Sequence, residues 1–306
     1  MHIYRSEVTE KLCSLDSHLL ANIKGQDHVI ARLTSVLKRG ELRICPPNRP
    51  KRSFLFVGPT GTGKTEITQC FTDYLFGEGH LIRFDMSEFM TPASLGRFIG
   101  EKERETGLMG KKLKEIPYGT LLFDEMEKAE PRILDLFLQI LDAGRITLAD
   151  HKTWPLMNYY IVFTSNIGSA EIRNMVRSPF STIERVILNQ VNETLRPELV
   201  GRITEKIVFN KLSYEIQLEI CKNMLQKELR QLETLGFFLT AGQEVINFLI
   251  SVGFNKHLGA RPLRAAIEKS LGDLIAAQIL KGLPTSGVIG VNDLKTGLVL
   301  EGILME

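Results

Sequence analysis

The residues with the clearest chemical potential are residues 58–65, which read GPTGTGKT. The run fits the pattern Gly-x-x-x-x-Gly-Lys-Thr, and it stands between an apolar run at 54–57 and a helical pattern at 66–75. Glycines let backbone N–H groups curl around phosphates, and the dipole of a following helix favours the same anion. We therefore expect a phosphate-binding loop formed by Gly58, Pro59, Thr60, Gly61, Thr62, Gly63, Lys64 and Thr65. In it, Lys64 would reach the β and γ phosphates and Thr65 would ligate Mg²⁺.

Two acidic residues, Asp124 and Glu125, directly follow the apolar run at 121–123. Asp124 is expected to hold Mg²⁺, through water, and Glu125 to act as general base on the attacking water. An apolar run that ends in Asp-Glu is by itself most often an ordinary strand terminus. Together with the phosphate-binding loop, it favours an ATPase site that uses ATP and Mg²⁺ as cofactors.

Asn166 ends another strand-like run, at 159–165. In a parallel sheet the carboxyl ends of the strands face the ligand crevice, so Asn166 is placed to orient the same water. Asparagine at the end of a strand is also a common turn former, and the residues alone leave both interpretations open.

Short β-type runs at 54–57, 81–85, 120–123 and 159–164 alternate with helix-length segments, which predicts an α/β fold with a parallel sheet covered by helices. One packing helix is predicted by a stripe of apolar residues that recur at helical spacing and stop before Gly144. The stripe consists of Ile133, Leu134, Phe137, Leu138 and Leu141.

The chain is expected to divide into three parts. Residues 1–50 would form helices and a proline-rich linker, and residues 51–208 a large nucleotide-binding domain. Residues 209–306 would form a smaller, mostly helical domain. In this last part we expect helices at 214–235, from 241 and at 261–281, and a hairpin of the apolar runs at 288–291 and 298–303.

Charge and cysteine usage limit the function classes. Lys and Arg number 38 and Asp and Glu 36, giving a net charge of +2 with the signs interspersed, so no footprint for nucleic acid or anionic membrane is visible. The four cysteines are far apart and form no CxxC pair, which fits free thiols in a reducing compartment. No secretory signal or apolar run near membrane-spanning length is present. These features predict a soluble, cytoplasmic protein.

Several uncommon motifs occur in a fixed order after the phosphate-binding loop: Asp-Met-Ser-Glu at 85–88, Leu-Phe-Asp-Glu-Met-Glu-Lys-Ala at 122–129, Leu-Asp-Ala-Gly-Arg at 141–145 and Thr-Ser-Asn at 164–166. With them, the chain resembles the second ATPase module of the Clp unfoldases and disaggregases, within the AAA+ superfamily. The resemblance covers nearly the whole chain. It implies a P-loop NTPase sheet sandwiched by helices, followed by a small helical lid domain with a short hairpin.

The resemblance also implies roles for single residues. Ile23, in the segment Ile-Lys-Gly-Gln at 23–26, matches the adenine-contacting segment, and Asn166 matches the first sensor of the γ phosphate. Arg202 matches an arginine finger that reaches the ATP of a neighbouring subunit, and Arg261, in Gly-Ala-Arg-Pro-Leu at 259–263, matches the second sensor. Each arginine alone would more often be a solvated charge. A finger acting in trans implies a ring of identical subunits, a hexamer in this family.

The chain departs from the family where a Gly-Tyr-Val-Gly loop grips threaded polypeptide. The corresponding stretch, 99–112, has no tyrosine. Leu108 or Met109, flanked by Gly107 and Gly110, would provide a softer apolar grip, or else the stretch is a charged surface loop that grips nothing.

Two further family features are missing. No Ile-Gly-Phe or Ile-Gly-Leu tripeptide, which docks a Clp peptidase, occurs between Asn166 and Arg196, so a peptidase partner is not expected. We also expect no recognition domain or first ATPase module before residue 1. The chain is therefore expected to be either a minimal single-ring motor or a fragment of a longer protein.

Three function hypotheses follow. The leading one is an ATP-hydrolysing ring motor that remodels or unfolds an unknown protein client. The second is an ATP-controlled assembly factor for one dedicated protein complex, without threading. The third, a nucleic-acid motor, is disfavoured because its candidate phosphate contacts alternate with glutamates; these contacts are Lys102, Arg104, Lys111, Lys112 and Lys114.

Overall fold

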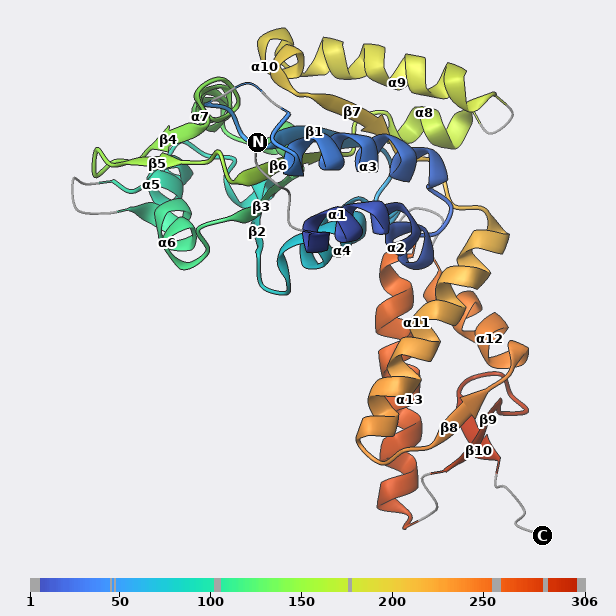
Figure 1. Ribbon diagram of the computed structural model, residues 1–306. Helices are drawn as coiled ribbons and strands as arrows, with labels where there is room; N and C mark the ends of the chain where they lie inside the picture. Colours follow the sequence, from blue (N-terminus) through green and yellow to red (C-terminus); the bar gives the residue numbers. More distant parts are fainter. Residues whose placement is uncertain are drawn as a thin grey trace. The chain divides into compact units, whose positions relative to one another are not determined.

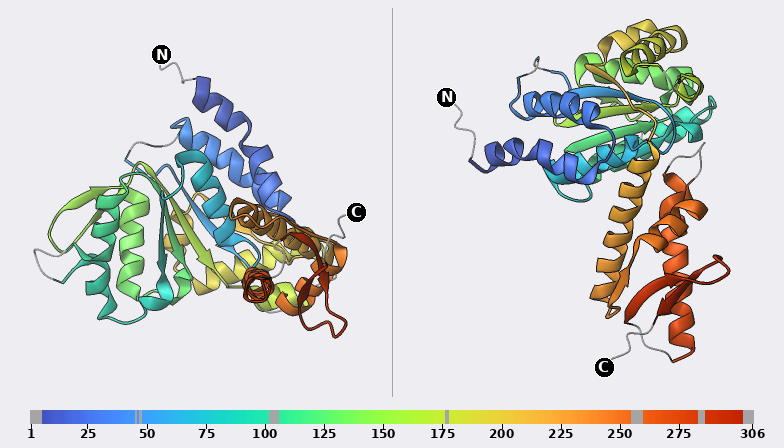
Figure 2. Two further views of the ribbon diagram at one scale, coloured as in Figure 1. Left: turned by 90° about the horizontal axis from the view of Figure 1, so that it is seen from below. Right: turned by 90° about the vertical axis from the view of Figure 1, so that its right-hand side faces the viewer.

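The computed structural model describes residues 6–44, 46, 48–101, 106–175, 178–254, 260–282 and 286–301. The chain forms two compact units, each with a core of its own (Figures 1 and 2). The first comprises residues 1–59 and 63–211, and the second comprises residues 60–62 and 212–306. Of the basic residues considered above as nucleic-acid contacts, Lys102 and Arg104 lie outside the described residues.

A five-stranded parallel sheet is the centre of the first unit (Figure 1). Its strands, in spatial order, are β2 (Leu81–Asp85), β3 (Gly119–Asp124), β6 (Tyr159–Ser165), β1 (Arg52–Val57) and β7 (Glu205–Val208). The four predicted strands are confirmed. The fifth, β7, was not predicted, because only its last two residues are apolar. The predicted α/β fold class is likewise confirmed.

Helices cover both faces of the sheet, which explains why β3 and β6 are buried along their whole length. The helices of the first unit are α1 (Ser6–Cys13), α2 (Leu15–Asn22), α3 (Asp27–Glu41), α4 (Lys64–Phe76), α5 (Ser94–Ile99), α6 (Gly107–Glu115), α7 (Pro131–Ala143), α8 (Ser169–Asn174), α9 (Phe180–Thr194) and α10 (Pro197–Arg202). Residues of α2, α3 and α4 share one core cluster, and residues of α6, α7 and α9 share the other.

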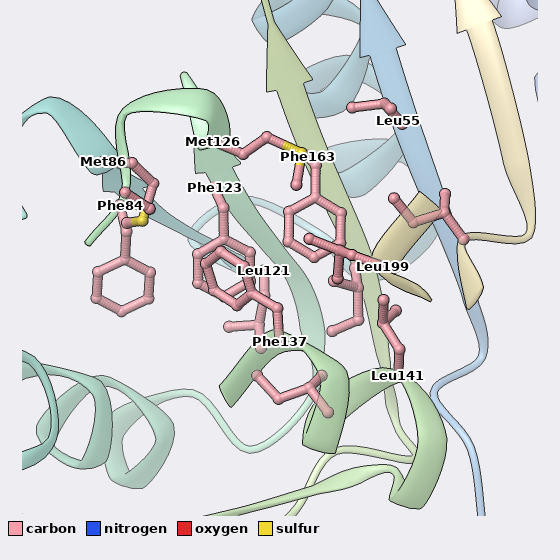
Figure 3. Close-up of a cluster of buried hydrophobic side chains, with 14 of the residues drawn as sticks. Leu55, Phe84, Met86, Leu121, Phe123, Met126, Phe137, Leu141, Phe163 and Leu199 are labelled. Atoms are coloured by element: carbon pink, nitrogen blue, oxygen red, sulfur yellow. The ribbon is translucent and has the colours of Figure 1, made fainter. Parts of the chain in front are cut away.

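The cluster under α7 contains several aromatic rings that contact one another (Figure 3). Phe137 of α7 packs on Phe123 and Phe163, from adjacent strands, with ring centroids 4.5 and 5.0 Å apart. Full burial of each such ring contributes about 1.5–3 kcal/mol. The helix itself is set by its ends, since the Glu130 carboxylate caps its start and Gly144, at φ 57°, ends it. The predicted packing helix is confirmed.

The second unit is a helical layer against a small sheet. Its elements are α11 (Tyr214–Thr234), β8 (Leu239–Ala241), α12 (Gln243–Gly253), α13 (Arg261–Leu280), β9 (Gly287–Val291) and β10 (Leu298–Glu301). The predicted hairpin is present as the antiparallel pair of β9 and β10, although its expected last residue, Ile303, lies outside the described residues. β8 adds a third, parallel strand that was not predicted.

The region of the missing tyrosine contains a helix, α6, and of the two alternatives for this stretch the structure contradicts an exposed grip at Met109. Met109 is 0% exposed and belongs to the main core cluster, and Leu108 is half-buried against the same cluster. The glycines have a packing role here: a Cβ on Gly107 would lie 2.4 Å from the backbone nitrogen of Gly100. The apolar residues of this stretch therefore stabilise the fold, and neither is a freely exposed grip.

A small hairpin, β4 (Arg145–Thr147) and β5 (Thr153–Pro155), follows α7. Two single-turn 3-10 helices complete the unit: η1 (Met86–Glu88) after β2 and η2 (Met126–Lys128) after β3. η1 begins directly after Asp85, the last residue of β2, whereas Glu125 separates η2 from Asp124, the last residue of β3. Both turn the chain away from the carboxyl edge of the sheet where the candidate site lies.

Candidate functional site

The glycine-rich loop joins β1 to α4, and glycine is required at its two ends. Gly58 has φ 144°, and a Cβ there would lie 2.7 Å from the carbonyl oxygen of Phe209. Gly63 has φ 102° and is the last residue before α4 begins at Lys64. Side chains rarely adopt these backbone angles. The loop therefore directs the amino end of a thirteen-residue helix toward the carboxyl edge of the sheet.

Lys64 is folded inward over this loop. Its Nζ donates to the carbonyl oxygens of Gly58 and Pro59, the latter at 3.0 Å, and to Oδ1 of Asn166 at 3.1 Å. Burial lowers the pKa of Lys64 to about 8, although nearby carboxylates, first that of Glu127, oppose the shift. The ammonium group thus stands in a dry site beside several negative charges.

Asp124 ends β3 as a buried carboxylate with a donor on each oxygen. Thr164 Oγ1, on the neighbouring strand β6, donates to Oδ1 at 2.8 Å. Arg83 Nε, on β2, donates to Oδ2 at 2.5 Å. Asp124 is 5% exposed, so these partners are needed to offset the loss of hydration. The carboxylate is consequently fixed in orientation.

Glu125 has a left-handed backbone, φ 55°, which is uncommon for a residue with a side chain. Its N–H donates to Thr164 Oγ1 at 3.1 Å, which holds this turn to β6. Its carboxylate accepts from Nδ2 of Asn166 at 3.1 Å and pairs with Nζ of Lys128 at 2.6 Å. A non-glycine residue in this conformation at a polar site is typical of functional positions.

Asn166 connects the separate parts of the site. Its side chain accepts from Lys64 and donates to Glu125, and its backbone N–H donates to Oε1 of Glu127 at 3.0 Å. The structure therefore brings together four of the predicted residues, namely Lys64, Asp124, Glu125 and Asn166. Sequence reasoning missed Thr164, although it lies two residues before Asn166 and so faces the same side of β6.

Arg202 and Ile23 lie apart from this cluster within the first unit, and Arg261 belongs to the second unit. Arg202, the last residue of α10, pairs with Asp142 of α7 at 2.5 Å. Ile23 is buried after α2 in the core cluster shared with α3 and α4. Arg261 is the exposed first residue of α13 in the second unit, and Gly259, from the same motif, lies outside the described residues.

The segment 23–26 is tied to the first unit's sheet through Gln26. Its fully buried side chain donates to the carbonyl oxygen of Asn210 at 2.9 Å and accepts the N–H of the same residue at 3.1 Å. Nearby, His28 Nε2 lies 3.0 Å from the carbonyl oxygen of Val208. These bonds fix the start of α3 beside the end of β7.

The available oxygen donors fit magnesium. Mg²⁺ is usually held by one or two carboxylates together with substrate phosphates, so the Asp124 carboxylate and a Thr65 hydroxyl form a sufficient protein contribution. In the part of the chain that the structure describes, no cluster of three or more His, Cys, Asp or Glu side chains could hold a metal by itself. A divalent ion at this site would therefore depend on the nucleotide for further ligands.

Comparison with known proteins places this geometry in a family. Residues 49–206 match the family described as AAA domain (Cdc48 subfamily). The chain belongs to the AAA family. Residues 212–289 match the C-terminal, D2-small domain of ClpB protein, so the predicted likeness to the second Clp module is confirmed.

Individual relatives are similar to most of this chain. The chain is 35% identical over 281 residues to chaperone protein ClpB 2 of Nostoc sp., which covers 89% of this chain and 32% of the relative. It is 34% identical over 292 residues to heat shock protein 100 of Trypanosoma brucei brucei, covering 92% of this chain and 34% of the relative. The chain thus spans about a third of the length of these relatives.

Solved structures show the same architecture. The Hsp104–ADP complex of S. cerevisiae superposes with a TM-score of 0.87 and 29% identity, covering 98% of this chain and 54% of that one. A closed-state reconstruction of Hsp104 with ATPγS and FITC casein gives 0.84 and 30%, covering 98% and 53%. In the described part of the AAA chain, no helix has both the length and the apolar character needed to cross a membrane.

Proposed function

We propose that this AAA module binds ATP with Mg²⁺ and hydrolyses it. The observation that carries the proposal is the meeting of Lys64, Asp124, Glu125 and Asn166 at the carboxyl edge of the sheet, directly before the amino end of α4. A cation, a metal-binding carboxylate, a base and an orienting amide are the groups that phosphoryl transfer to water requires.

In this proposal residues 58–65 enclose the phosphates. Lys64 exchanges its bonds to the carbonyls of Gly58 and Pro59 for the β and γ phosphates, and Thr65 and Asp124 hold the metal. Bound Mg²⁺ would neutralise charge on the phosphate oxygens.

Glu125 accepts a proton from the attacking water. Asn166, which already donates to Oε1 of Glu125, orients that water and senses the γ phosphate. In the structure, both oxygens of Glu125 have donors, from Asn166 and Lys128. Each carboxylate oxygen can accept a second hydrogen bond, so the attacking water can approach while these partners hold the side chain in place.

We further propose that the module works in a ring of identical subunits, a hexamer, in the cytoplasm. Arg202 is half-exposed at the end of α10 and is held by one carboxylate, that of Asp142, so a stronger anionic partner can recruit it. It would reach the ATP of the next subunit, while Arg261 and Ile23 would contact nucleotide within the subunit. The large domain, 51–208, and the lid, 209–306, would then move with nucleotide state.

The resulting activity is ATP-driven remodelling or unfolding of a protein client. Support comes from the ClpB and heat shock protein 100 relatives and from the Hsp104 structure with casein. A second candidate is an assembly factor for one dedicated complex, which the burial of Met109 favours because that residue offers no exposed grip.

Steady-state ATP hydrolysis across a protein concentration series, with light scattering for size, separates the two. The motor proposal expects turnover that rises with ring formation and is stimulated by unfolded casein. Rings that hydrolyse ATP but ignore casein would favour the dedicated factor, and hydrolysis that is independent of assembly would contradict the trans role of Arg202.

A further inference from the structure

Arg83 contacts the candidate metal-binding carboxylate although it lies on a different strand. It stands on β2, at the edge of the sheet, in register with Leu122 of β3. Leu122 is two residues before Asp124, so Arg83 and Asp124 project from the same face, one step apart along the strand direction. The long guanidinium side chain spans that step, and Nε meets Oδ2 at 2.5 Å.

Asp85 places a second carboxylate beside the first, since it is in register with Asp124. Its Oδ1 accepts from the N–H of Ser87 at 2.9 Å and from the Ser87 hydroxyl at 2.6 Å. Burial opposes its ionisation, but these bonds and the charges of Arg83 and Lys128 outweigh burial, so the pKa of Asp85 is lowered. Arg83 therefore serves as counter-charge to two neighbouring carboxylates.

The two oxygens of Asp124 are not equivalent. Oδ1 takes a neutral hydroxyl, from Thr164, and Oδ2 takes a full positive charge, from Arg83. The Arg83 side chain is 48% exposed, whereas that of Asp124 is 7% exposed. The guanidinium can thus move toward solvent, while the carboxylate cannot.

We infer that Arg83 is a positioning residue that competes with a divalent cation for Asp124, and so makes metal binding depend on the nucleotide. It holds the carboxylate in place before the metal arrives. It also weakens the attraction of the bare site for a divalent ion, because two positive charges would meet at one carboxylate. Phosphate oxygens of the nucleotide then supply the ligands and charge that tip the balance. The inference rests on the proposed metal role of Asp124.

Mn²⁺ binding to the nucleotide-free protein, followed by the electron paramagnetic resonance signal of free Mn²⁺, tests this competition. Arg83→Gln is expected to bind Mn²⁺ about tenfold more tightly than the wild type, which corresponds to about 1.4 kcal/mol. Arg83→Lys keeps the charge but shortens the reach, so about threefold tighter binding is expected. Arg97→Gln is the matched control, because Arg97 pairs with Glu88 at 2.5 Å and both side chains are exposed; it should leave Mn²⁺ affinity unchanged.

The gain in Arg83→Gln should disappear when Asp124→Asn is added. The inference is overturned if Arg83→Gln binds Mn²⁺ with the same affinity as the wild type. If Arg83→Gln does not unfold cooperatively on heating, the same result for Arg83→Lys overturns it. Failure of the proposed function would give a different result. If Asp124 does not hold the metal, Asp124→Asn will bind Mn²⁺ in the presence of ATP as tightly as the wild type does.

Discussion

The hydroxyl of Thr164 donates to Oδ1 of Asp124 at 2.8 Å and also accepts the N–H of Glu125 at 3.1 Å. One side chain of β6 thereby fixes both the proposed metal ligand and the proposed base of β3. β3 and β6 are paired in parallel, with Phe123 opposite Phe163. The next residues, Asp124 and Thr164, therefore meet at the carboxyl edge of the sheet.

Thr164→Val, which keeps the shape but removes both hydrogen bonds, should lower the rate constant for ATP hydrolysis about 10- to 100-fold. Nucleotide affinity should change by less than about threefold, because the phosphate-binding loop is untouched. Stopped-flow binding and single-turnover hydrolysis measure the two quantities. Thr164→Ser is the control, since it keeps the hydroxyl and should retain most of the rate. Equal loss in both variants would show that packing, not the hydroxyl, is required.

Lys64→Met should make the nucleotide-free protein more stable while abolishing ATP binding. The difference between a pKa of about 8 in the fold and 10.5 outside corresponds to about 3 kcal/mol against burial of the ammonium. Carbonyls that lose their donor reduce the gain, so about 1–3 kcal/mol at pH 7 is expected.

The pH dependence has a definite sign. Below pH 8 both states of the wild type hold the Lys64 proton, and the full cost is present. Between about pH 8 and 10.5 the unfolded state binds more protons than the folded state, so the free energy of unfolding of the wild type rises with pH. The stability difference from Lys64→Met therefore becomes smaller. Urea unfolding at pH 7 and pH 9.5 measures the difference; a stability gap that is equal at both values would contradict it. Lys112→Met, at an exposed pair with Glu115, should show no such trend.

Arg202→Ala should lose ATP hydrolysis by about a hundredfold or more, as arginine fingers do, while keeping nucleotide binding. If the finger acts in trans, mixing Arg202→Ala with Lys64→Ala should restore part of the activity. The second variant contributes its intact Arg202 to the nucleotide of the first. Arg196→Ala is the matched control, because Arg196 pairs with Asp135 at the same 2.5 Å and should be dispensable. No recovery on mixing, although both variants assemble, would argue against the trans role.

Met109→Ala should destabilise the first unit by about 2–5 kcal/mol, since Met109 is fully buried. Leu108→Ala, at the half-buried neighbouring position, should cost clearly less. Thermal unfolding followed by circular dichroism compares the two. If instead Met109→Ala keeps wild-type stability and selectively loses stimulation by unfolded protein, a gripping role would have to be restored.

Strands were predictable from runs of apolar residues, even where one charged residue interrupts the run, as Arg83 does in β2. β1, β3 and β6 are buried nearly throughout and were found from their composition. β7 begins with Glu205 and Lys206, which do not suggest a strand, and Glu205 is accommodated by a bond from Arg32 Nε at 3.0 Å. The order of the strands follows from long crossovers and could not be derived from local pattern.

The residues of the site also divide into those that local motifs predict and those that they do not. Lys64, Asp124 and Glu125 stand in motifs whose spacing indicates their chemistry directly. Arg83 and Thr164 reach the site only through the register of adjacent strands, which no local motif encodes. A grip at Leu108 or Met109 was considered because this stretch corresponds to the family's gripping loop; the burial of Met109 follows from tertiary packing, which the local sequence does not encode.

Single-turnover hydrolysis of ATP bound to Glu125→Gln tests whether Glu125 is the base of this site. The amide keeps the size of the side chain and an oxygen that can accept from Asn166, but it cannot take a proton from water. ATP affinity is expected to stay within about threefold of the wild-type value, and hydrolysis is expected to slow by about a hundredfold or more. Hydrolysis at the wild-type rate would contradict Glu125 as the base, and with it the proposed site.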